Sequence, residues 1–305
     1  GDTGDTGDTG DTGDSNDSSG SGDGSDSSGS GDTDDSSDSD GSNNDSDRGS
    51  TEDSGDTGDN GDTGDNGDSD SDHNAVEPVV SVSNSNSVNF SGVDTSNEQA
   101  VAALNGPSVT IDNSSLYIGY EQVSNNNKDP VLMRFTDGEL DWQRQDYETT
   151  SDDSTGYGLL WDGTDHLYAV FSVTGTQGQP EQDFREFASN GWLSSYGQGG
   201  GAEISVIAKV NPDNGNINNA TFLSAVLSNG ESNTLTVNDL SLNGENLVVQ
   251  AESFFSPRNT DTTAMENTGQ DTESPFDYEI EFTPDLSTAV RAEAPGFQAA
   301  TSSGI

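Results

Sequence analysis

The sequence contains no cysteine, which excludes disulfide bonds and thiolate chemistry. Basic side chains are also scarce, because 8 lysines and arginines stand against 57 acids and leave a net charge of −49. A protein that binds nucleic acid needs a basic surface to displace counterions from phosphates, so we expect no nucleic-acid partner. No apolar run approaches the roughly 18 residues of a membrane-spanning helix, so we expect the chain not to span a membrane.

Residues 1–74 lack every apolar and aromatic side chain. They carry 24 of the acids and a single base, Arg48, and are built largely from Gly-Asp-Thr and Ser-Asp units. Such a segment cannot bury enough apolar surface to offset the entropy lost on ordering, so we expect a disordered acidic tail. We expect it to act as a spacer that holds divalent cations only diffusely, since its aspartates lack the spacing of an EF-hand loop.

The tail resembles the tether of bacterial surface lipoproteins, in which a spacer rich in Gly, Asp, Ser and Thr precedes a folded domain. That resemblance implies export and a lipid anchor on a cysteine just ahead of Gly1. A cysteine-free chain fits a bacterial exported protein as well as a cytosolic one. The acid excess also fits adaptation to high salt, because Lys128 and Lys209 are the only lysines. We expect an extracellular or cell-surface location.

Residues 75–305 form the apolar part of the chain and are predicted to be one all-β domain. Short β-rich runs are separated by Asn, Asp and Gly, and helical periodicity is nearly absent. Three segments, at about residues 106–146, 157–225 and 236–291, repeat the order strand, polar turn, strand, connection, strand, polar turn, strand. Four antiparallel strands form a β-propeller blade, so we predict a propeller-like array of four-stranded antiparallel blades.

The second repeat contains a more specific motif. It reads Gly-Tyr-Gly at 156–158, Asp-Gly-Thr-Asp-His at 162–166 and Ala-Lys-Val-Asn-Pro-Asp-Asn-Gly at 208–215. These residues resemble the bacterial SBBP-type β-propeller repeat, which implies a propeller blade. Closed propellers have about four to eight blades. With three repeats visible, we expect an incomplete ring or one closed by a partner, unless residues 79–104 add strands or a divergent blade.

The repeats differ most in the connection between their second and third strands, which is longest at 175–202 and 253–275. In a propeller these connections share one rim with the link between blades at 143–157. Loops on one rim of a rigid scaffold often bind ligands. We therefore predict a ligand-binding rim made of Phe184, Arg185, Trp192, Tyr196, Tyr147, Tyr157 and Arg258. The alternative is that these aromatic residues fix the long loop to the domain.

Three carboxylates on the same rim, Asp146, Asp152 and Asp153, are candidate calcium ligands, because hard cations prefer oxygen. The alternative is a solvated acidic loop. His166 is the only histidine after residue 74, and we expect it to be an exposed turn residue. The Gly197-x-Gly199 segment precedes a predicted strand rather than a helix, so it is not a dinucleotide loop. We identify no catalytic residues.

These observations favour an exported, surface-tethered, non-catalytic binding module that uses the rim. Its expected partners are an extracellular polysaccharide or a surface protein. One alternative is a polysaccharide-degrading enzyme on the same scaffold, which would need two carboxylates facing each other across a cleft. Another is a subunit of an extracellular assembly.

Overall fold

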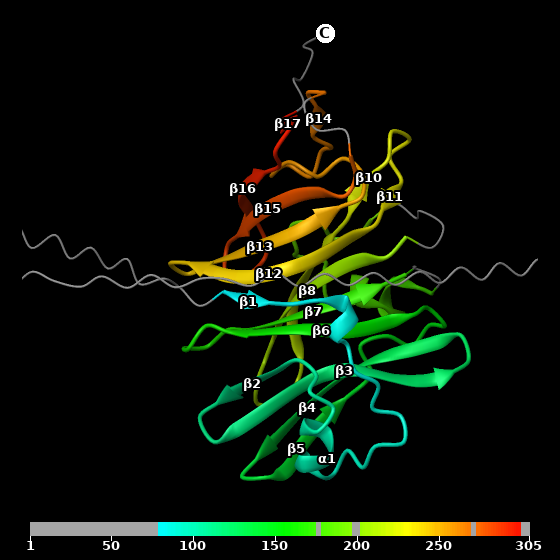
Figure 1. Cartoon of the computed structure of the whole chain (residues 1–305), viewed down its shortest axis with the longest axis vertical. Helices are drawn as coiled ribbons and strands as arrows, with labels where there is room; N and C mark the ends of the chain where they lie inside the picture. The colour runs from blue at the N-terminus through cyan, green and yellow to red at the C-terminus, as the bar shows by residue number, and fades with distance from the viewer. Residues whose placement is uncertain (1–78, 175–177, 197–201, 270–272, 300–305) are drawn as a thin grey trace, which may run out of the picture. The chain divides into compact units, whose positions relative to one another are not determined.

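The computed structural model describes residues 79–174, 178–196, 202–269 and 273–299. The tail predicted for residues 1–74 lies outside the described residues. Three main antiparallel sheets follow one another along the chain (Figure 1). The first two contain four consecutive strands each, the third contains four strands together with β1, and the sheets correspond in order to the three predicted repeats. The prediction of an all-β domain with several four-stranded antiparallel sheets is therefore confirmed.

The first sheet is formed by β2 (Ser108–Ile111), β3 (Ser114–Ser124), β4 (Asn127–Thr136) and β5 (Glu139–Arg144). Its last turn is the pair Asp137-Gly138, and both residues have positive φ angles, 51° and 88°. Two such residues form the tight hairpin turn whose twist matches that of the flanking strands. The Asp137-Gly138 pair therefore fixes where β4 ends and β5 begins.

The second sheet is formed by β6 (Ser154–Trp161), β7 (Leu167–Val173), β8 (Ile204–Val210) and β9 (Ile217–Leu223). Every residue of β7 is buried, and β6 and β8 have one half-buried residue each. A strand covered on both faces reads as a continuous apolar run, whereas a half-exposed strand alternates. The second sheet therefore lies inside the domain.

The third sheet is formed by β12 (Leu235–Asn243), β13 (Asn246–Ser253), β15 (Phe276–Phe282) and β16 (Ala289–Glu293), with β1 (Val80–Ser81) paired to β12. Two short pairs complete the strands, namely β10 (Ala225–Val226) with β11 (Ser232–Asn233) and β14 (Glu266–Asn267) with β17 (Phe297–Gln298). The helical elements are α1 (Glu98–Ala102) and three 3-10 turns, η1 (Asn84–Asn86), η2 (Pro180–Gln182) and η3 (Phe184–Glu186).

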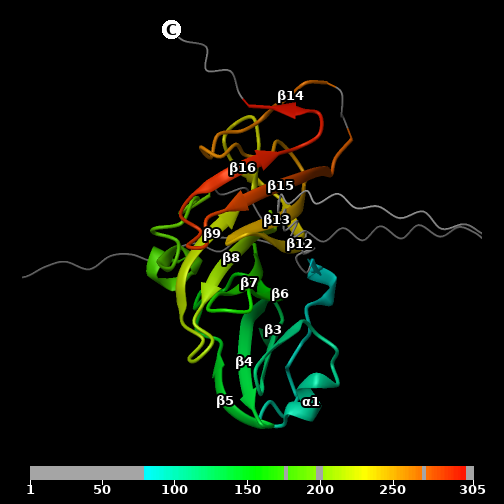
Figure 2. The same cartoon turned by 90° about the vertical axis from the view of Figure 1, so that its left-hand side faces the viewer.

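The three sheets are stacked, with the second between the first and the third (Figures 1 and 2). Alternate residues of β7 show why, since Phe171 packs against Leu116 and Ile118 of the first sheet in one cluster. Val170 belongs to a second cluster with Val249 of the third sheet. Successive side chains of a strand point to opposite faces, so one strand contributes to both interfaces. In the described residues the stack does not close into a ring or barrel.

The two outer faces of the stack differ. The outer face of the first sheet is apolar and is covered by residues 88–104, with Phe90 and Val101 packed on Met133 and Phe135. The outer face of the third sheet is polar, because the outward residues of β13 and β15 include Gln250 and Glu279. Residues 79–104 thus add strand β1 and a cap rather than another four-stranded sheet. Polar or covered end faces are typical of the terminal units of a stacked array.

Candidate functional site

The described parts of the three predicted rim loops lie in contact. The backbone N–H of Thr149 donates to the carbonyl of Gln182 at 2.9 Å, which joins the loop before β6 to the loop after β7. The indole Nε1 of Trp192 donates to the carbonyl of Thr260 at 2.6 Å, which joins that loop to the one after β13. In a meander of four strands, these connections all leave from the same end of their sheets.

Four of the predicted rim aromatics are buried. Phe184 is 1% exposed and lies 4.8 Å from the ring of Phe171 between centroids. Tyr196 is 8% exposed and packs against the ring of Phe222, with centroids 5.1 Å apart. Tyr147 is 2% exposed, and its hydroxyl donates to a carbonyl of the β8–β9 turn. These rings fix the loops to the sheets, which is the alternative given above.

Tyr157 is fully buried between the second and third sheets. Its hydroxyl is 2.8 Å from Oγ of Ser205 and accepts the backbone N–H of Val237 at 3.1 Å. Burial raises the pKa of Tyr157 to about 12. Tyr157 therefore joins two sheets through its hydroxyl and offers no surface to a ligand.

The two predicted rim arginines form internal hydrogen bonds. Arg185 makes a two-pronged ion pair with Asp183, with Nε 2.9 Å from Oδ1 and Nη2 2.6 Å from Oδ2. Arg258 donates from Nη1 to the carbonyl of Thr262 at 2.7 Å and from Nε to the carbonyl of Ser224 at 3.2 Å. Burial lowers the pKa of Arg258. Both side chains order loop backbone, and their binding role stays a prediction.

The long loop after β7 covers the free edge of β9. The backbone N–H groups of Ala220 and Phe222 donate to the carbonyls of Phe187 and Leu193, each at 3.0 Å. Trp192 is half-buried and packs edge-on against Phe282, with centroids 5.5 Å apart. An uncovered edge strand is a template for pairing with another chain. The loop after β7, which we predicted to bind a ligand, therefore also shields the edge strand β9 from pairing with another chain.

The SBBP-like turn at 211–216 is held by the first sheet. Arg134 Nη1 and Trp142 Nε1 both donate to the carbonyl of Pro212, at 2.9 and 3.2 Å. Arg144 donates to the carbonyl of Asn214 at 3.4 Å. The motif that carries the family resemblance thus joins the first and second sheets.

The candidate calcium ligands Asp146, Asp152 and Asp153 do not bring their carboxylate oxygens within 4.8 Å of one another, and their metal-binding role stays a prediction. Asp146 is 64% exposed at its side chain and pairs with Arg144, whose Nε is 2.6 Å from Oδ1. The hydrogen bond with Arg144 lowers the pKa of Asp146. Asp152 and Glu148 are each 3% exposed. Burial raises the pKa of Glu148, and the negative charge of Asp152 adds slightly to that rise.

Another group of potential metal ligands occurs at the β6–β7 turn. Among the described residues, only Asp162, Asp165 and His166 bring three ligand atoms within 4.8 Å of one another. Oδ1 of Asp162 accepts the backbone N–H groups of Thr164, Asp165 and His166, and Oδ2 lies 2.6 Å from Nδ1 of His166. Burial opposes ionisation of Asp162, but these hydrogen bonds outweigh it and lower the pKa to about 2. His166 lies in a turn, as predicted, but the prediction that it is exposed is wrong, because its side chain is only 19% exposed and pairs with Asp162.

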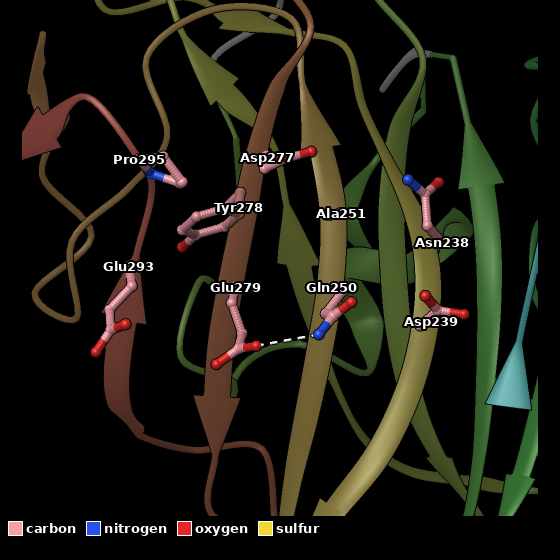
Figure 3. Close-up of a pocket in the computed structure, with 9 residues that line it drawn as sticks. All are labelled: Asn238, Asp239, Gln250, Ala251, Asp277, Tyr278, Glu279, Glu293 and Pro295. Carbon is pink, nitrogen blue, oxygen red and sulfur yellow. Dashed lines mark hydrogen bonds between the residues drawn. The ribbon is translucent and has the colours of Figure 1, made fainter. Parts of the chain in front are cut away.

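The outer face of the third sheet contains a hollow of about 510 Å³. Its lining side chains come from four adjacent strands and from Pro295, which follows β16 (Figure 3). Strand pairing places Asp239, Gln250, Glu279 and Glu293 in one row across β12, β13, β15 and β16. Gln250 Nε2 donates to Oε2 of Glu279 at 3.1 Å. The row presents amide and carboxylate oxygens to solvent.

The charge on this face is strongly negative. Arg291 is its single basic residue and contacts three glutamates. Its Nη2 lies 2.5 Å from Glu279, its Nε 3.3 Å from Glu281 and its Nη1 3.4 Å from Glu293. The outward acids of the four strands are Asp239, Glu252, Asp277, Glu279, Glu281 and Glu293. We name this surface the acidic face.

The acidic face was not among our predicted sites, although its signal is present in the sequence. Residues 276–282 read Phe-Asp-Tyr-Glu-Ile-Glu-Phe, so acids alternate with apolar residues. That alternation predicts a strand with one buried and one acidic face. Its neighbours across β13 and β16 depend on strand register, which the sequence alone does not give.

No protein-family model and no curated protein matches the chain. No helix of the described residues is long and apolar enough to cross a membrane. The fold and its surface define an all-β domain of stacked antiparallel sheets with one acidic face. The SBBP-type resemblance rests on the residues quoted above, and function has to be argued from the surface.

Proposed function

We propose that this protein is an exported, surface-tethered, non-catalytic binding module and that it binds through the acidic face of the third sheet. One observation carries the choice of surface, namely the hollow of about 510 Å³ lined by a row of polar side chains from four strands. Ligand sites are concave and hold a few convergent polar groups. The rim loops fit less well, because Phe184 and Tyr147 are buried.

We propose in addition that the three sheets are blades of a propeller-like array that stays open. The stacking of successive four-stranded meanders and the SBBP-like residues of the second sheet support this interpretation. The cap of residues 88–104 on the first sheet and the acidic face of the third favour an array that ends at both sides. An open end face is then available for a partner.

The partner that fits this face is a surface protein with a basic patch. The acidic face has six outward acids and one arginine. A positively charged partner therefore associates faster, and acidic competitors are repelled. The interaction should weaken as salt rises, since exposed charges are screened over about 8 Å at physiological ionic strength. The test also distinguishes a second possible partner, a polysaccharide that forms hydrogen bonds with the row of amide and carboxylate oxygens.

The alternative of a polysaccharide-degrading enzyme would use Glu279 and Glu293, which are direct neighbours across β15 and β16. Arg291 forms ion pairs with both carboxylates. A glycosidase needs its two carboxyl groups on either side of the bond that it cleaves, whereas these two lie side by side on one face of a sheet. Binding without chemistry is therefore the better supported function, and an assembly of identical copies through two acidic faces is disfavoured by repulsion.

The test is carboxyl footprinting of the full chain by carbodiimide labelling and mass spectrometry, which reads each acid separately from those of the tail. The two probes are an octalysine peptide and a neutral glucan. We expect octalysine to reduce labelling of Asp277 and Glu293 several-fold and to leave Glu139 and Glu245 unchanged. Protection by the glucan instead would identify a polysaccharide partner. Protection confined to rim acids such as Glu181, or to the tail, would contradict the proposal.

The matched variants remove equal charge at two places. We expect the double substitution Glu279→Gln and Glu293→Gln to abolish the protection of Asp277. The control, Glu139→Gln with Glu245→Gln, also removes two negative charges, but from exposed positions outside the acidic face. It should leave the protection of Asp277 intact. Equal loss in both variants would mean that only net charge matters.

A further inference from the structure

The last strand of the third sheet, β16, has an unpaired edge next to the acidic face. It ends the strand order β1-β12-β13-β15-β16, and no other strand of the described residues pairs with its outer side. The last strand of the second sheet differs, because the loop after β7 shields the edge of β9. An unpaired edge presents a row of N–H and C=O groups with which another chain can pair.

The edge of β16 lacks several features that block such pairing. Edge strands are commonly protected by lysine, proline or a bulge. The sequence of β16, Ala-Val-Arg-Ala-Glu, contains neither lysine nor proline. Its irregularity lies before Arg291, and Arg291, Ala292 and Glu293 pair regularly with β15. In an antiparallel pair, residues alternate between facing the partner strand and facing away, so three regular residues offer at least two outward hydrogen-bonding groups.

Glu293 is the last member of the row that crosses the acidic face (Figure 3). Neighbouring strands lie about 4.8 Å apart, so a strand added beside β16 would extend this row by one position. A basic side chain at that position would lie directly opposite Glu293, and opposite charges across two strands attract. The acidic face therefore favours a strand with basic residues at alternate positions.

The intervening side chains of an added strand would point to the other face of the sheet. On that side Ala292 packs against the core of the third sheet and lines a second hollow of about 400 Å³, together with Met265 and Phe297. Glu293 and Pro295 line both this hollow and the hollow of the acidic face, so the two hollows meet at β16. The apolar lining favours an apolar side chain.

We propose that the partner adds an extended segment as a new strand to the edge of β16, with basic residues over the acidic face and apolar residues toward the second hollow. This inference rests on the proposed function and adds the conformation and side-chain pattern of the partner. In this mode of recognition, main-chain hydrogen bonds supply affinity and alternate side chains supply specificity. A folded basic patch would be held by its side chains alone.

The experiment compares two peptides on the full chain. One is Lys-Val-Lys-Val-Lys-Val-Lys, and the other is the same peptide with its internal amides N-methylated, which keeps every charge and side chain but cannot donate these hydrogen bonds. Carbodiimide labelling of Glu293 and Asp277 is followed as each peptide is titrated, so that binding to the tail is not counted. We expect N-methylation to weaken the protection about 10-fold, because at least two backbone hydrogen bonds are lost.

Hydrogen exchange followed by mass spectrometry then locates the bound peptide. We expect the unmodified peptide to slow the exchange of amides in Ala289–Glu293 and to leave Glu139–Arg144 unchanged. The second segment is the internal control, because β5 likewise ends the strand order of the first sheet.

Three outcomes would count against strand addition. Equal protection of Glu293 by the two peptides would overturn it and leave the acidic face as the binding surface. Exchange slowed as much in β5 as in β16 would also overturn it, because any unpaired edge would then suffice. Protection of neither Glu293 nor Asp277 by either peptide would contradict the proposed function itself, and strand addition with it.

Discussion

At the scale of single residues, the buried tyrosine hydroxyls are structural groups. Tyr157 contacts Ser205 of the second sheet and Val237 of the third through one oxygen atom. Neighbouring Gly156 and Gly158 leave no room for a side chain, because a Cβ would lie 2.3 Å from Ile118 and 2.7 Å from Val82. The Gly-Tyr-Gly motif thus fits between two sheets rather than around a ligand.

The substitution Tyr157→Phe tests this role. It leaves the N–H of Val237 without its buried acceptor, while Ser205 keeps its hydrogen bond to the carbonyl of Leu235, and we expect a loss of about 1–3 kcal/mol in the free energy of unfolding. Urea denaturation measures it. Tyr120→Phe, at a half-buried position on the first sheet, is the control and should change the stability by less than about 0.5 kcal/mol. Equal stability of the two variants would contradict the role given to Tyr157.

At the scale of elements, the loop after β7 approaches the backbone of β9 closely at Gly191. A Cβ at Gly191 would lie 1.9 Å from the carbonyl oxygen of Ala220, so only glycine allows the loop to approach β9. We expect Gly191→Ala to separate the loop from β9 and to lower the free energy of unfolding by at least about 1–3 kcal/mol. Thermal unfolding and light scattering measure the loss and the aggregation of the uncovered edge. Ser189→Ala, exposed in the same loop, should behave as the parent chain.

The same loop shows how far sequence reasoning extends. The order and four-strand grouping of the main sheets followed from alternating apolar residues and from turn pairs such as Asp137-Gly138, because these signals are local. The short strands β1, β10, β11, β14 and β17 were not predicted. The burial of Phe184 and Tyr196 did not follow, since it depends on how an irregular segment packs on β9 and Phe222. The acidic face was likewise invisible until strand register placed residues from β12 to β16 in one row.

At the scale of the whole molecule, the charge of −49 and a few perturbed carboxyl groups determine the response to pH. Burial raises the pKa of Glu148, so the folded form binds its proton more tightly than the unfolded form does. Its contribution to stability is greatest at low pH and is lost as pH rises through the folded pKa. Protonation of other acids also reduces the general repulsion.

Asp162 acts in the opposite direction. Its pKa is about 2 in the folded form against an ordinary 3.8, so it stabilises the fold above pH 3.8 and loses that contribution as pH falls toward 2. Together these shifts predict that Tm rises as pH falls through the raised pKa of Glu148 and then decreases as pH falls from 3.8 toward 2. Differential scanning calorimetry at five pH values measures this curve. Glu148→Gln should flatten the first part, and Asp162→Asn the second.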